Sequence, residues 1–387
     1  MSELPDGWIS LSLGQAGRWM SGGTPSTSNP DYWGGDIPWI GSGSLTDFRL
    51  MDSDRRVTSA GVANGTRLVE PGTILMVVRG MSLKTDFRIG WATRPMAFGQ
   101  DCKALVAGPG IDPTFLAYAI LAKTPAVLGI VDEAGHGTGR LNTDQLFALT
   151  VSLPQPSEQK AIAEVLGSLD DKIAVNTATV DLLVQHQIAE YEISLLRGLE
   201  SQPLDEVAEF HNRKRVPLSA IERDERPGPI PYYGATGVFG SVDQSLFNDN
   251  LVLVGEDGSV ITPCGLPVIQ YIWGPSWVNN HAHVLTGRSV STELLRFALA
   301  RMNVASLVTG AVQPKISMGK LKGLVLELPT SDELLRLEQL VASEMALVRA
   351  TSDQTKTLAA MRDALLPLLM AGKIRIKDAE QMVGDVV

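Results

Sequence analysis

The pattern of apolar and polar positions divides this 387-residue chain into four stretches of two alternating kinds. In the two longer stretches, short apolar runs alternate with glycine, proline and asparagine, which is typical of β-strands joined by turns. Each is followed by a stretch in which apolar residues recur every three or four positions, which predicts a long helix. We therefore expect an α+β fold in the order domain, helix, domain, helix, with a short C-terminal tail. The predicted bounds are 1–153, 154–200, 201–328, 329–377 and 378–387.

The chain also carries an internal repeat. Two strand-like runs that end in proline, Leu146–Pro154 and Leu321–Pro329, match at an offset of 175 residues. Each is followed by a helix-start signal: Ser157 precedes the first helix, and a Thr-x-x-Glu capping box at Thr330 opens the second. Earlier segments match more loosely, namely 36–41 with 229–234, 73–80 with 251–258 and 98–105 with 278–285. The repeat predicts two similar β-rich domains that differ in their loops and are related by a pseudo-twofold axis.

The helical stretches resemble an antiparallel coiled coil. Their core-like positions are Ile162, Leu166, Leu169, Ile173, Val180 and Leu183 in the first, and Leu337, Leu340, Leu347, Leu358, Met361, Leu365 and Leu368 in the second. Polar residues take the remaining slots, with Asn176 in the first helix and Glu344, Thr351 and Gln354 in the second; such layers cost stability but fix register. Each helix would span about 50–60 Å. We expect Pro367 to kink or end the second one.

Composition narrows the setting. The two cysteines have neither zinc-site nor thioredoxin-like spacing, which favours a reducing cytoplasm. The first residues lack the pattern of a signal peptide, and no apolar run is long enough to span a membrane. The net charge of −10 argues by itself against a nucleic-acid partner. However, the acidity is densest in residues 154–200, with 3 basic against 8 acidic side chains. The two long segments are nearly neutral, so DNA binding is permitted.

Motifs for catalysis are missing from the sequence. There is no phosphate-binding Gly-x-x-x-x-Gly-Lys-Ser/Thr loop, and the run 29–32 (Asn-Pro-Asp-Tyr) falls short of the loop with which DNA amino-methyltransferases hold a base. Glu256 and Asp257 lie at a glycine turn without the third acid and lysine of a nuclease. His281 and His283 alternate on one face but lack a third ligand, so a structural or DNA-facing role is favoured over a metal site. We expect no catalytic residue, metal or cofactor.

Taken in chain order, several motifs resemble the specificity subunits of type I restriction-modification systems, up to about residue 377. These motifs are Gly22–Ser26 with Tyr32–Ile40, Leu153–Gln159 with Leu169–Ile173, Tyr232–Gly237, Asn279–His283, Gln313–Ile316 and Leu369–Arg375. The second copy departs from the family's pattern in two places. Leu334 stands where the first copy has Gln159, and Pro367 interrupts the last helix, so the equivalence of the two helical docking faces stays open.

The resemblance implies a non-catalytic, cytoplasmic prokaryotic protein that reads a bipartite target in double-stranded DNA. Each target-recognition domain would read one half of that target. The antiparallel helices would set the gap and dock two DNA adenine methyltransferase subunits, and motor-nuclease subunits would join to form the restricting complex. Residues on the partner-docking helices are Ile162, Leu169, Ile173, Leu347, Leu358 and Leu365.

Candidate DNA contacts are basic, amide or aromatic side chains on or beside glycine-rich turns, because phosphates attract Lys and Arg while base edges are read by Arg, Lys, Asn and Gln. In the first domain they are Arg79, Lys84, Arg88, His136 and Arg140, and in the second Arg213, Lys214, Arg215, Tyr233, Gln313 and Lys315. A solvated surface charge remains the alternative for each of them.

Two other functions stay open at this point. A protein-interaction adaptor with two β-rich modules on a coiled coil would account for the acidity and the heptads, but not for two matched motif sets with differing loops. A stand-alone modification and restriction enzyme is disfavoured by the missing catalytic motifs.

Overall fold

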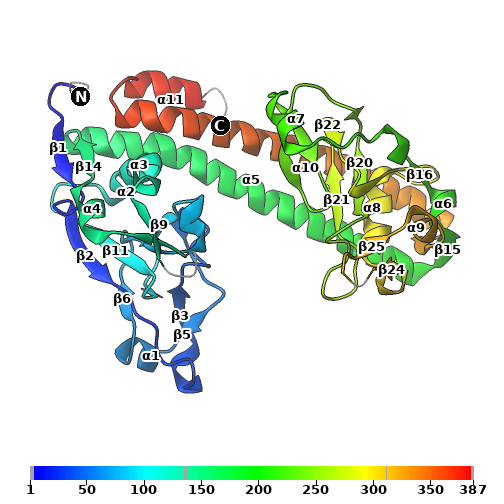
Figure 1. Cartoon of the computed structure of the whole chain (residues 1–387), viewed down its shortest axis with the longest axis horizontal. Coiled ribbons are helices and arrows are strands. Elements are labelled where there is room, and N and C mark those ends of the chain that lie inside the picture. The colour runs from blue at the N-terminus through cyan, green and yellow to red at the C-terminus, as the bar shows by residue number, and fades with distance from the viewer. Residues whose placement is uncertain (1–3, 135–137, 311, 385–387) are drawn as a thin grey trace. The chain divides into compact units, whose positions relative to one another are not determined.

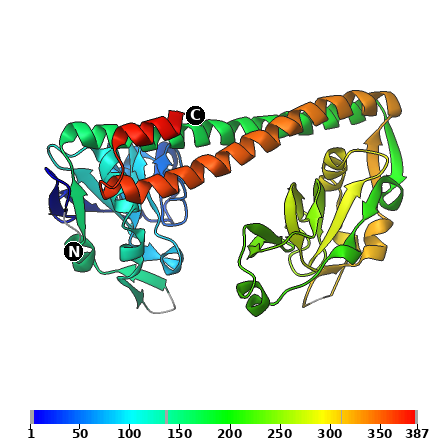
Figure 2. The same cartoon turned by 90° about the horizontal axis from the view of Figure 1, so that it is seen from above.

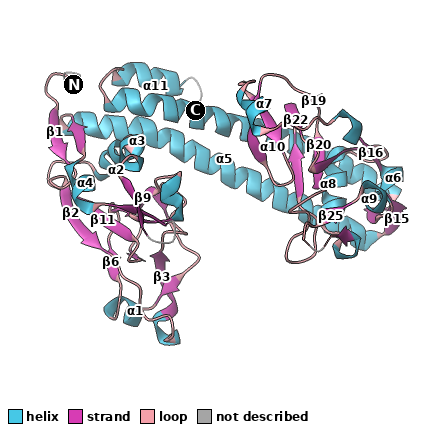
Figure 3. Ribbon diagram, viewed as in Figure 1, coloured by secondary structure: helices cyan, strands magenta, loops and turns pink. Residues whose placement is uncertain are grey.

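The structure is a computed structural model that describes residues 4–134, 138–310 and 312–384. The chain divides into two compact units (Figure 1): residues 1–174 with 356–387 form the first, and residues 175–355 form the second. Both units combine β-sheets with helices (Figure 3), so the prediction of an α+β fold with two β-rich domains is confirmed.

Two sheets dominate the first unit. The larger has the order β2-β11-β7-β9-β4, and the smaller has the order β5-β3-β10-β6, in which β3 and β10 are parallel. A three-stranded sheet β12-β13-β8 and a two-stranded ladder β1-β14 complete the unit. The strands are β1 Ile9–Ser12, β2 Gly17–Ser21, β3 Trp33–Ile40, β4 Arg49–Leu50, β5 Arg56–Val57, β6 Arg67–Val69, β7 Ile74–Val77, β8 Arg79–Gly80, β9 Ile89–Ala92, β10 Met96–Phe98, β11 Cys102–Ala107, β12 Val131–Ala134, β13 Thr138–Leu141 and β14 Thr150–Leu153.

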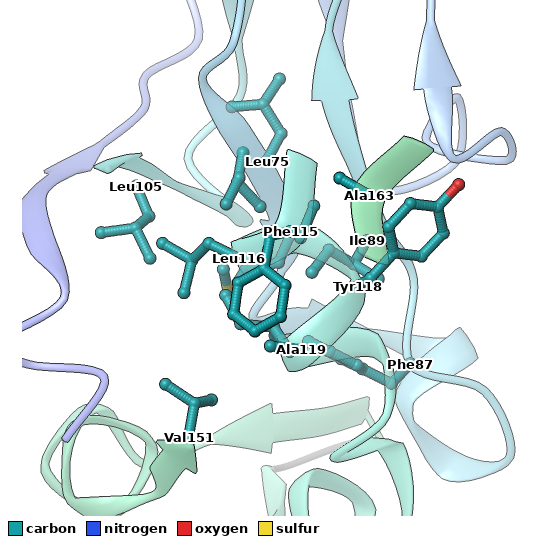
Figure 4. Packing of buried hydrophobic residues seen from close by; sticks show 14 of the residues in the cluster. Leu75, Phe87, Ile89, Leu105, Phe115, Leu116, Tyr118, Ala119, Val151 and Ala163 are labelled. Carbon is teal, nitrogen blue, oxygen red and sulfur yellow. The ribbon is translucent and has the colours of Figure 1, made fainter. Parts of the chain in front are cut away.

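The core of this unit lies between the larger sheet and helix α2, Pro113–Leu121 (Figure 4). Every residue of β7, the central strand of the larger sheet, is buried in this core. The Asp112 side chain caps α2 by accepting a 2.8 Å hydrogen bond from the Phe115 amide, and a proline occupies the first turn. The other short helices are η1 Pro30–Tyr32, α1 Ser59–Ala63, η2 Met81–Lys84, α3 Thr124–Leu128 and α4 Thr143–Ala148.

The second unit repeats this plan with fewer strands. Its sheets have the orders β16-β23-β20-β21 and β18-β17-β22-β19, beside the hairpin β24-β25 and the ladder β15-β26. The strands are β15 Leu199–Pro203, β16 Ala208–Phe210, β17 Ile230–Tyr233, β18 Val238–Val242, β19 Phe247–Asn248, β20 Leu251–Gly255, β21 Ile269–Ile272, β22 Pro275–Val278, β23 Ala282–Gly287, β24 Val308–Thr309, β25 Lys315–Ile316 and β26 Val325–Pro329. The helices outside the coiled coil are α6 Leu204–Val207, η4 Asn212–Lys214, α7 Ala220–Asp224, α8 Thr292–Ala300, η5 Ala305–Leu307 and α9 Met318–Lys322.

Corresponding strands of the two units pair in the same way. The parallel pair β3 and β10 corresponds to β17 and β22, and the central strand β7 corresponds to β20. Each closing ladder joins the start of a unit to the strand that precedes a long helix, as β1 with β14 and as β15 with β26. The internal repeat seen in the sequence is therefore a repeat of topology.

The two long helices are α5, Pro156–Arg197, and α10, Ser331–Met370. Within the second unit the two helices pack antiparallel (Figure 2). As the residue number increases along α5, the residue of α10 that it contacts has a lower number. The pairs are Asn176–Gln354, His186–Glu344, Glu190–Arg336 and Arg197–Glu333. Asn176 and Gln354, both placed at core-like positions by the heptad pattern, bond to each other at 2.9 Å. The polar layer is thus satisfied across the helix pair.

The buried face of α10 differs from the predicted one. Leu347 is 50 % exposed, whereas Val341, Met345 and Val348 are buried with residues of α8 in one cluster. The prediction for Leu347 is wrong because α10 packs against the second unit's core as well as α5, which rotates its buried face. Leu368 is also exposed.

The end of α10 is set by a glycine. Pro367 lies inside the helix, which continues to Met370, so the proline does not end it. Gly372 stops it by adopting a φ of +61°, and a side chain there would lie 2.5 Å from the Pro5 ring. The following residues form α11, Ile376–Gly384, whose Ala379 and Val383 are buried in the first unit's core. The segment described from sequence only as a tail is therefore largely helical.

Candidate nucleic-acid interface

In the first unit, three strand ends meet at one edge of the sheets. The Gly99 amide after β10 donates to the Ile40 carbonyl of β3 at 2.8 Å, and the Val78 amide after β7 donates to the Asp101 carbonyl at 2.9 Å. The short sheet β12-β13-β8 begins at this edge, because β8 directly follows β7. This edge, called the strand-end edge below, consists of turns, where loops can approach a ligand.

Four predicted contact residues of the first unit lie at this edge. Arg79 on β8 is directly opposite Arg140 on β13, and both side chains are exposed. Lys84 ends η2, which packs against β13, and it is also exposed. Arg88 lies beside the end of β7 and is half-buried, with its Nε 3.3 Å from Asp86 Oδ2. His136, the fifth candidate, lies outside the described residues.

Another exposed arginine of this unit, Arg55, was not singled out from the sequence. The Arg55 guanidinium lies 4.1 Å from the Trp33 ring and 4.7 Å from the Trp39 ring. Stacking on two indoles holds a cation without neutralising it. No local pattern relates Arg55 to these tryptophans, because β3 and β5 must pair before the three side chains meet.

The strand-end edge of the second unit holds a cavity of about 380 Å³. It forms where β17, β22 and β20 end: the Asn279 amide donates to the Tyr233 carbonyl at 3.0 Å, and the Glu256 amide donates to the His281 carbonyl at 2.8 Å. Its lining combines aromatic rings with hydrogen-bonding groups, including Tyr232, Phe239, Asp257, Asn279, Asn280 and His281. The motifs 232–237 and 279–283 were recognised in the sequence, but their residues were not predicted as contacts, except Tyr233.

Beside this cavity, a buried network surrounds Glu256. Its Oε2 accepts a 2.6 Å hydrogen bond from Arg215, and its Oε1 lies 3.6 Å from Lys315 Nζ. Arg215 also donates to the Ala282 carbonyl at 2.6 Å. The Arg215 side chain is only 12 % exposed, so its charge is offset within the unit and it holds the chain after η4 in place.

His283 has a structural role in this network. Its Nε2 donates to the Ile316 carbonyl at 2.8 Å, and its Nδ1 accepts from the Asn212 amide group at 2.8 Å. Both bonds are satisfied by the neutral imidazole. Burial lowers the pKa of His283, although Glu256 opposes the shift. The imidazole therefore ties β25 to β23, and His281 lies outside this arrangement and is exposed.

The remaining candidates of the second unit differ in exposure. Gln313 is exposed in the turn of the β24-β25 hairpin, and Lys315 is exposed on β25. Arg213 and Lys214 are exposed on η4, where Lys214 Nζ lies 6.0 Å from the Phe247 ring. Tyr233 is half-buried at the end of β17.

The long helices present fewer docking side chains than the heptad pattern suggested. Ile162, Leu169, Leu358 and Leu365 are buried in the first unit's core, and Ile173 packs against it. Of the six residues, Leu347 alone is largely exposed. The large apolar side chains that face outward on the second unit's part of α5 are Val175, Leu182, Ile188, Ile193 and Leu196. At 100° per residue all but Ile188 fall within roughly 60° of the helix circumference, and these four are called the α5 stripe below.

The first copy's motif 153–159 has an internal role. Gln159 is buried: its Oε1 accepts from the Asp112 amide at 2.9 Å, and its Nε2 donates to the Pro154 carbonyl at 2.9 Å. In the second copy, Leu334 packs against the core at this position. The departure between the copies therefore changes how each helix joins its own unit and does not alter an exposed face.

The motif 169–173 is explained in a similar way. Asp170 accepts hydrogen bonds from Tyr118 Oη at 2.5 Å and from Arg362 of α10 at 2.8 Å. Asp171 pairs with Arg49. These contacts join α5, α10 and α2.

The described residues contain neither a metal-binding cluster nor a membrane-spanning helix. Over residues 4–134, 138–310 and 312–384, no three His, Cys, Asp or Glu side chains are grouped so as to hold a metal ion. Across the same part of the chain, every helix is too short or too polar to cross a membrane.

The chain thus contains two β-rich units of one topology, each with part of both long helices and each with a strand-end edge that carries different side chains. A family profile described as "Type I restriction modification DNA specificity domain" matches residues 5–184 and 197–352. The chain belongs to this family. It is the DNA-specificity subunit of a type I restriction-modification system and is non-catalytic. This decides between the functions that the sequence left open.

Individual relatives agree with this assignment. The chain is 21 % identical to the type I restriction enzyme MjaIX specificity subunit of Methanocaldococcus jannaschii, over 98 % of this chain and 96 % of that one. It is 34 % identical to a putative type I specificity subunit of Haemophilus influenzae, over 35 % of each chain. The crystal structure of the type I S subunit from M. genitalium shares the fold, with a TM-score of 0.60 at 16 % identity over 95 % of this chain and 97 % of that one.

Proposed function

We propose that each unit reads one half of a bipartite duplex target through its strand-end edge, with 1–153 and 201–328 as the recognition domains. The observation that carries this proposal is that one edge is built twice with different side chains. In the first unit it presents Arg79, Lys84 and Arg140, and in the second it presents a cavity beside Lys315 and Gln313. Different side chains on one framework suit two different half-sites.

The long helices would set the gap between the half-sites and dock two DNA adenine methyltransferase subunits. The α5 stripe supports a docking role, because exposed apolar side chains aligned on one helix face are typical of a surface that a partner covers. Motor-nuclease subunits would join the assembly in the prokaryotic cytoplasm. Both long helices have residues in both units, which supports their role as a spacer.

Methylome sequencing of cells that carry this chain with a cognate methyltransferase subunit tests the proposal. We expect one asymmetric, gapped adenine-methylated motif. A continuous or palindromic motif would contradict it. Removal of seven residues from both helices, about 10 Å of helix, should then change the gap or abolish methylation while both half-sites stay the same. An unchanged gap would contradict the spacer role alone.

A further inference from the structure

The first unit carries two arginines that face each other without neutralisation. Arg79 and Arg140 are partners in the antiparallel β8–β13 register, so their side chains project from the same face. Neither forms an ion pair with any other residue that the structure describes. Asp132, the other cross-strand neighbour of Arg140, is exposed, and no ion pair between them is found among the described residues. Like charges directly opposite each other destabilise a sheet.

The local chain is built to hold this pair close to other backbone. In the same β8–β13 ladder, Gly139 pairs with Gly80. A Cβ atom on Gly139 would lie 2.9 Å from the Leu83 Cβ of η2. The glycine therefore allows η2 to pack on β13. This packing brings Lys84, at the end of η2, to the same short sheet.

In the second unit, the two residues at the corresponding positions carry opposite charges. The offset of 175 places Lys315 at the position of Arg140, and the match of 73–80 with 251–258 places Asp257 at the position of Arg79. The structure confirms this equivalence, because Asp257 and Lys315 form an antiparallel bridge. Lys315 Nζ also lies 3.6 Å from Glu256 Oε1. The two units therefore share this strand pairing, but the first has two arginines where the second has an aspartate and a lysine.

We propose that Arg79 and Arg140 form a clamp for a backbone phosphate of duplex DNA, and that the second unit lacks an equivalent clamp. This inference rests on the proposed function and deepens it: the two units hold their half-sites with unequal electrostatic strength. A phosphate between the two guanidiniums replaces their repulsion by two charge-assisted bonds. The second unit then holds its half-site without a pair of facing arginines at this register.

The test is the salt dependence of binding to a mixed-sequence duplex of about 30 base pairs, because each lost phosphate contact lowers the slope of log affinity against log salt by about 0.9. Fluorescence anisotropy is measured over a potassium chloride series for the full chain and for the double variant Arg79→Gln/Arg140→Gln. We expect the slope to fall by about 0.9, for the one phosphate that the pair holds, and the affinity at low salt to fall about tenfold or more. The melting temperature should not fall, because the substitution also removes the repulsion.

Arg94→Gln is the matched control. Arg94 is exposed, and it follows β9 at the end remote from Arg79, since β9 runs antiparallel to β7. Its slope should equal that of the wild type. The converse variant, Asp257→Arg, places a second positive charge beside Lys315 and should steepen the slope. Misfolding cannot produce a steeper slope, so the Asp257→Arg variant still tests the clamp if the double variant unfolds.

The possible results separate the two ideas. If the wild type binds duplex DNA and the double variant keeps its slope and affinity, the clamp is overturned while the proposed function stands. If the wild type binds no duplex at all, both fail. If inorganic phosphate raises the melting temperature of the wild type but not of the double variant, while duplex binding is the same for both, the pair is a site for a free anion and the duplex clamp is again overturned.

Discussion

Arg362 of α10 donates a 2.8 Å hydrogen bond to Asp170 of α5, and the carboxylate also accepts from Tyr118 at 2.5 Å. Asp170 is 9 % exposed. In the second unit, Arg349 of α10 donates to Glu293 Oε1 at 2.8 Å and to Tyr271 Oη at 2.7 Å. In each unit an arginine of α10 therefore bonds to a carboxylate that also accepts a hydrogen bond from a tyrosine, although the residues come from different sequence positions.

Removing one partner of such a buried ion pair should lower the free energy of unfolding strongly. We expect Arg362→Leu to destabilise the first unit by about 3 kcal/mol, because the Asp170 carboxylate would be left buried and unpaired. Thermal unfolding measures the change. Arg375→Leu removes the exposed ion pair with Asp378 and should leave the melting temperature nearly unchanged. Equal effects of the two substitutions would show that the buried ion pair is not important for stability.

The buried side-chain amide of Gln187 in α5 predicts that a substitution can stabilise the protein. Gln187 is 0 % exposed, and neither of its side-chain amide atoms has a hydrogen-bond partner among the described residues. We expect Gln187→Leu to stabilise the second unit by about 1–3 kcal/mol, because an unsatisfied polar group is replaced by an apolar one. Asn176→Leu is the matched control. It should destabilise, since it leaves the Gln354 side chain without the Asn176 amide. Urea denaturation that ranks the two variants in the reverse order would contradict this reading.

The buried imidazole of His283 predicts a dependence on pH. Burial lowers its pKa in the folded state, so the unfolded chain takes up a proton at higher pH than the folded chain does. The stabilisation is therefore complete above the ordinary pKa of about 6.5 and is lost as the pH falls below it towards the folded-state value. We expect urea midpoints of the second unit to decrease from pH 7.5 to 5.5, and His283→Gln to flatten this decrease. His281→Gln, an exposed control, should leave it unchanged.

The α5 stripe predicts a partner-binding phenotype. Leu182 is 66 % and Leu196 is 88 % exposed, so Leu182→Asp/Leu196→Asp should leave the melting temperature nearly unchanged. If the stripe docks a methyltransferase subunit, the variant should no longer co-purify with it, while binding of the isolated chain to duplex DNA remains. Intact co-purification would exclude the stripe from the docking surface. The control pair Met51→Asp/Ile221→Asp, at exposed apolar sites outside α5, should leave co-purification intact.

The sequence predicted the architecture well because the repeat, the heptads and the turn residues are local signals. It identified the two long helices and placed Asn176 and Gln354 at core-like positions, whereas their pairing came from the structure. It placed Leu347 in the core, because a heptad pattern assumes a single partner helix. This was wrong, because α10 also packs against the core of the second unit. Single contacts were harder to foresee. Arg213, Lys214 and Arg215 look alike in sequence, but only the fold brings Glu256 to Arg215 and neutralises it.

The first unit is made from two separate chain segments. Leu358, Leu365 and Leu369 of α10 and Ala379 of α11 are buried in its core, whereas all of the second unit lies between residues 175 and 355. During synthesis on the ribosome, the second unit can therefore complete its core while the first still waits for residues that have not been made. The half of the protein that is translated first is the half that finishes folding last, and until then its apolar surface is exposed to chaperones and to aggregation.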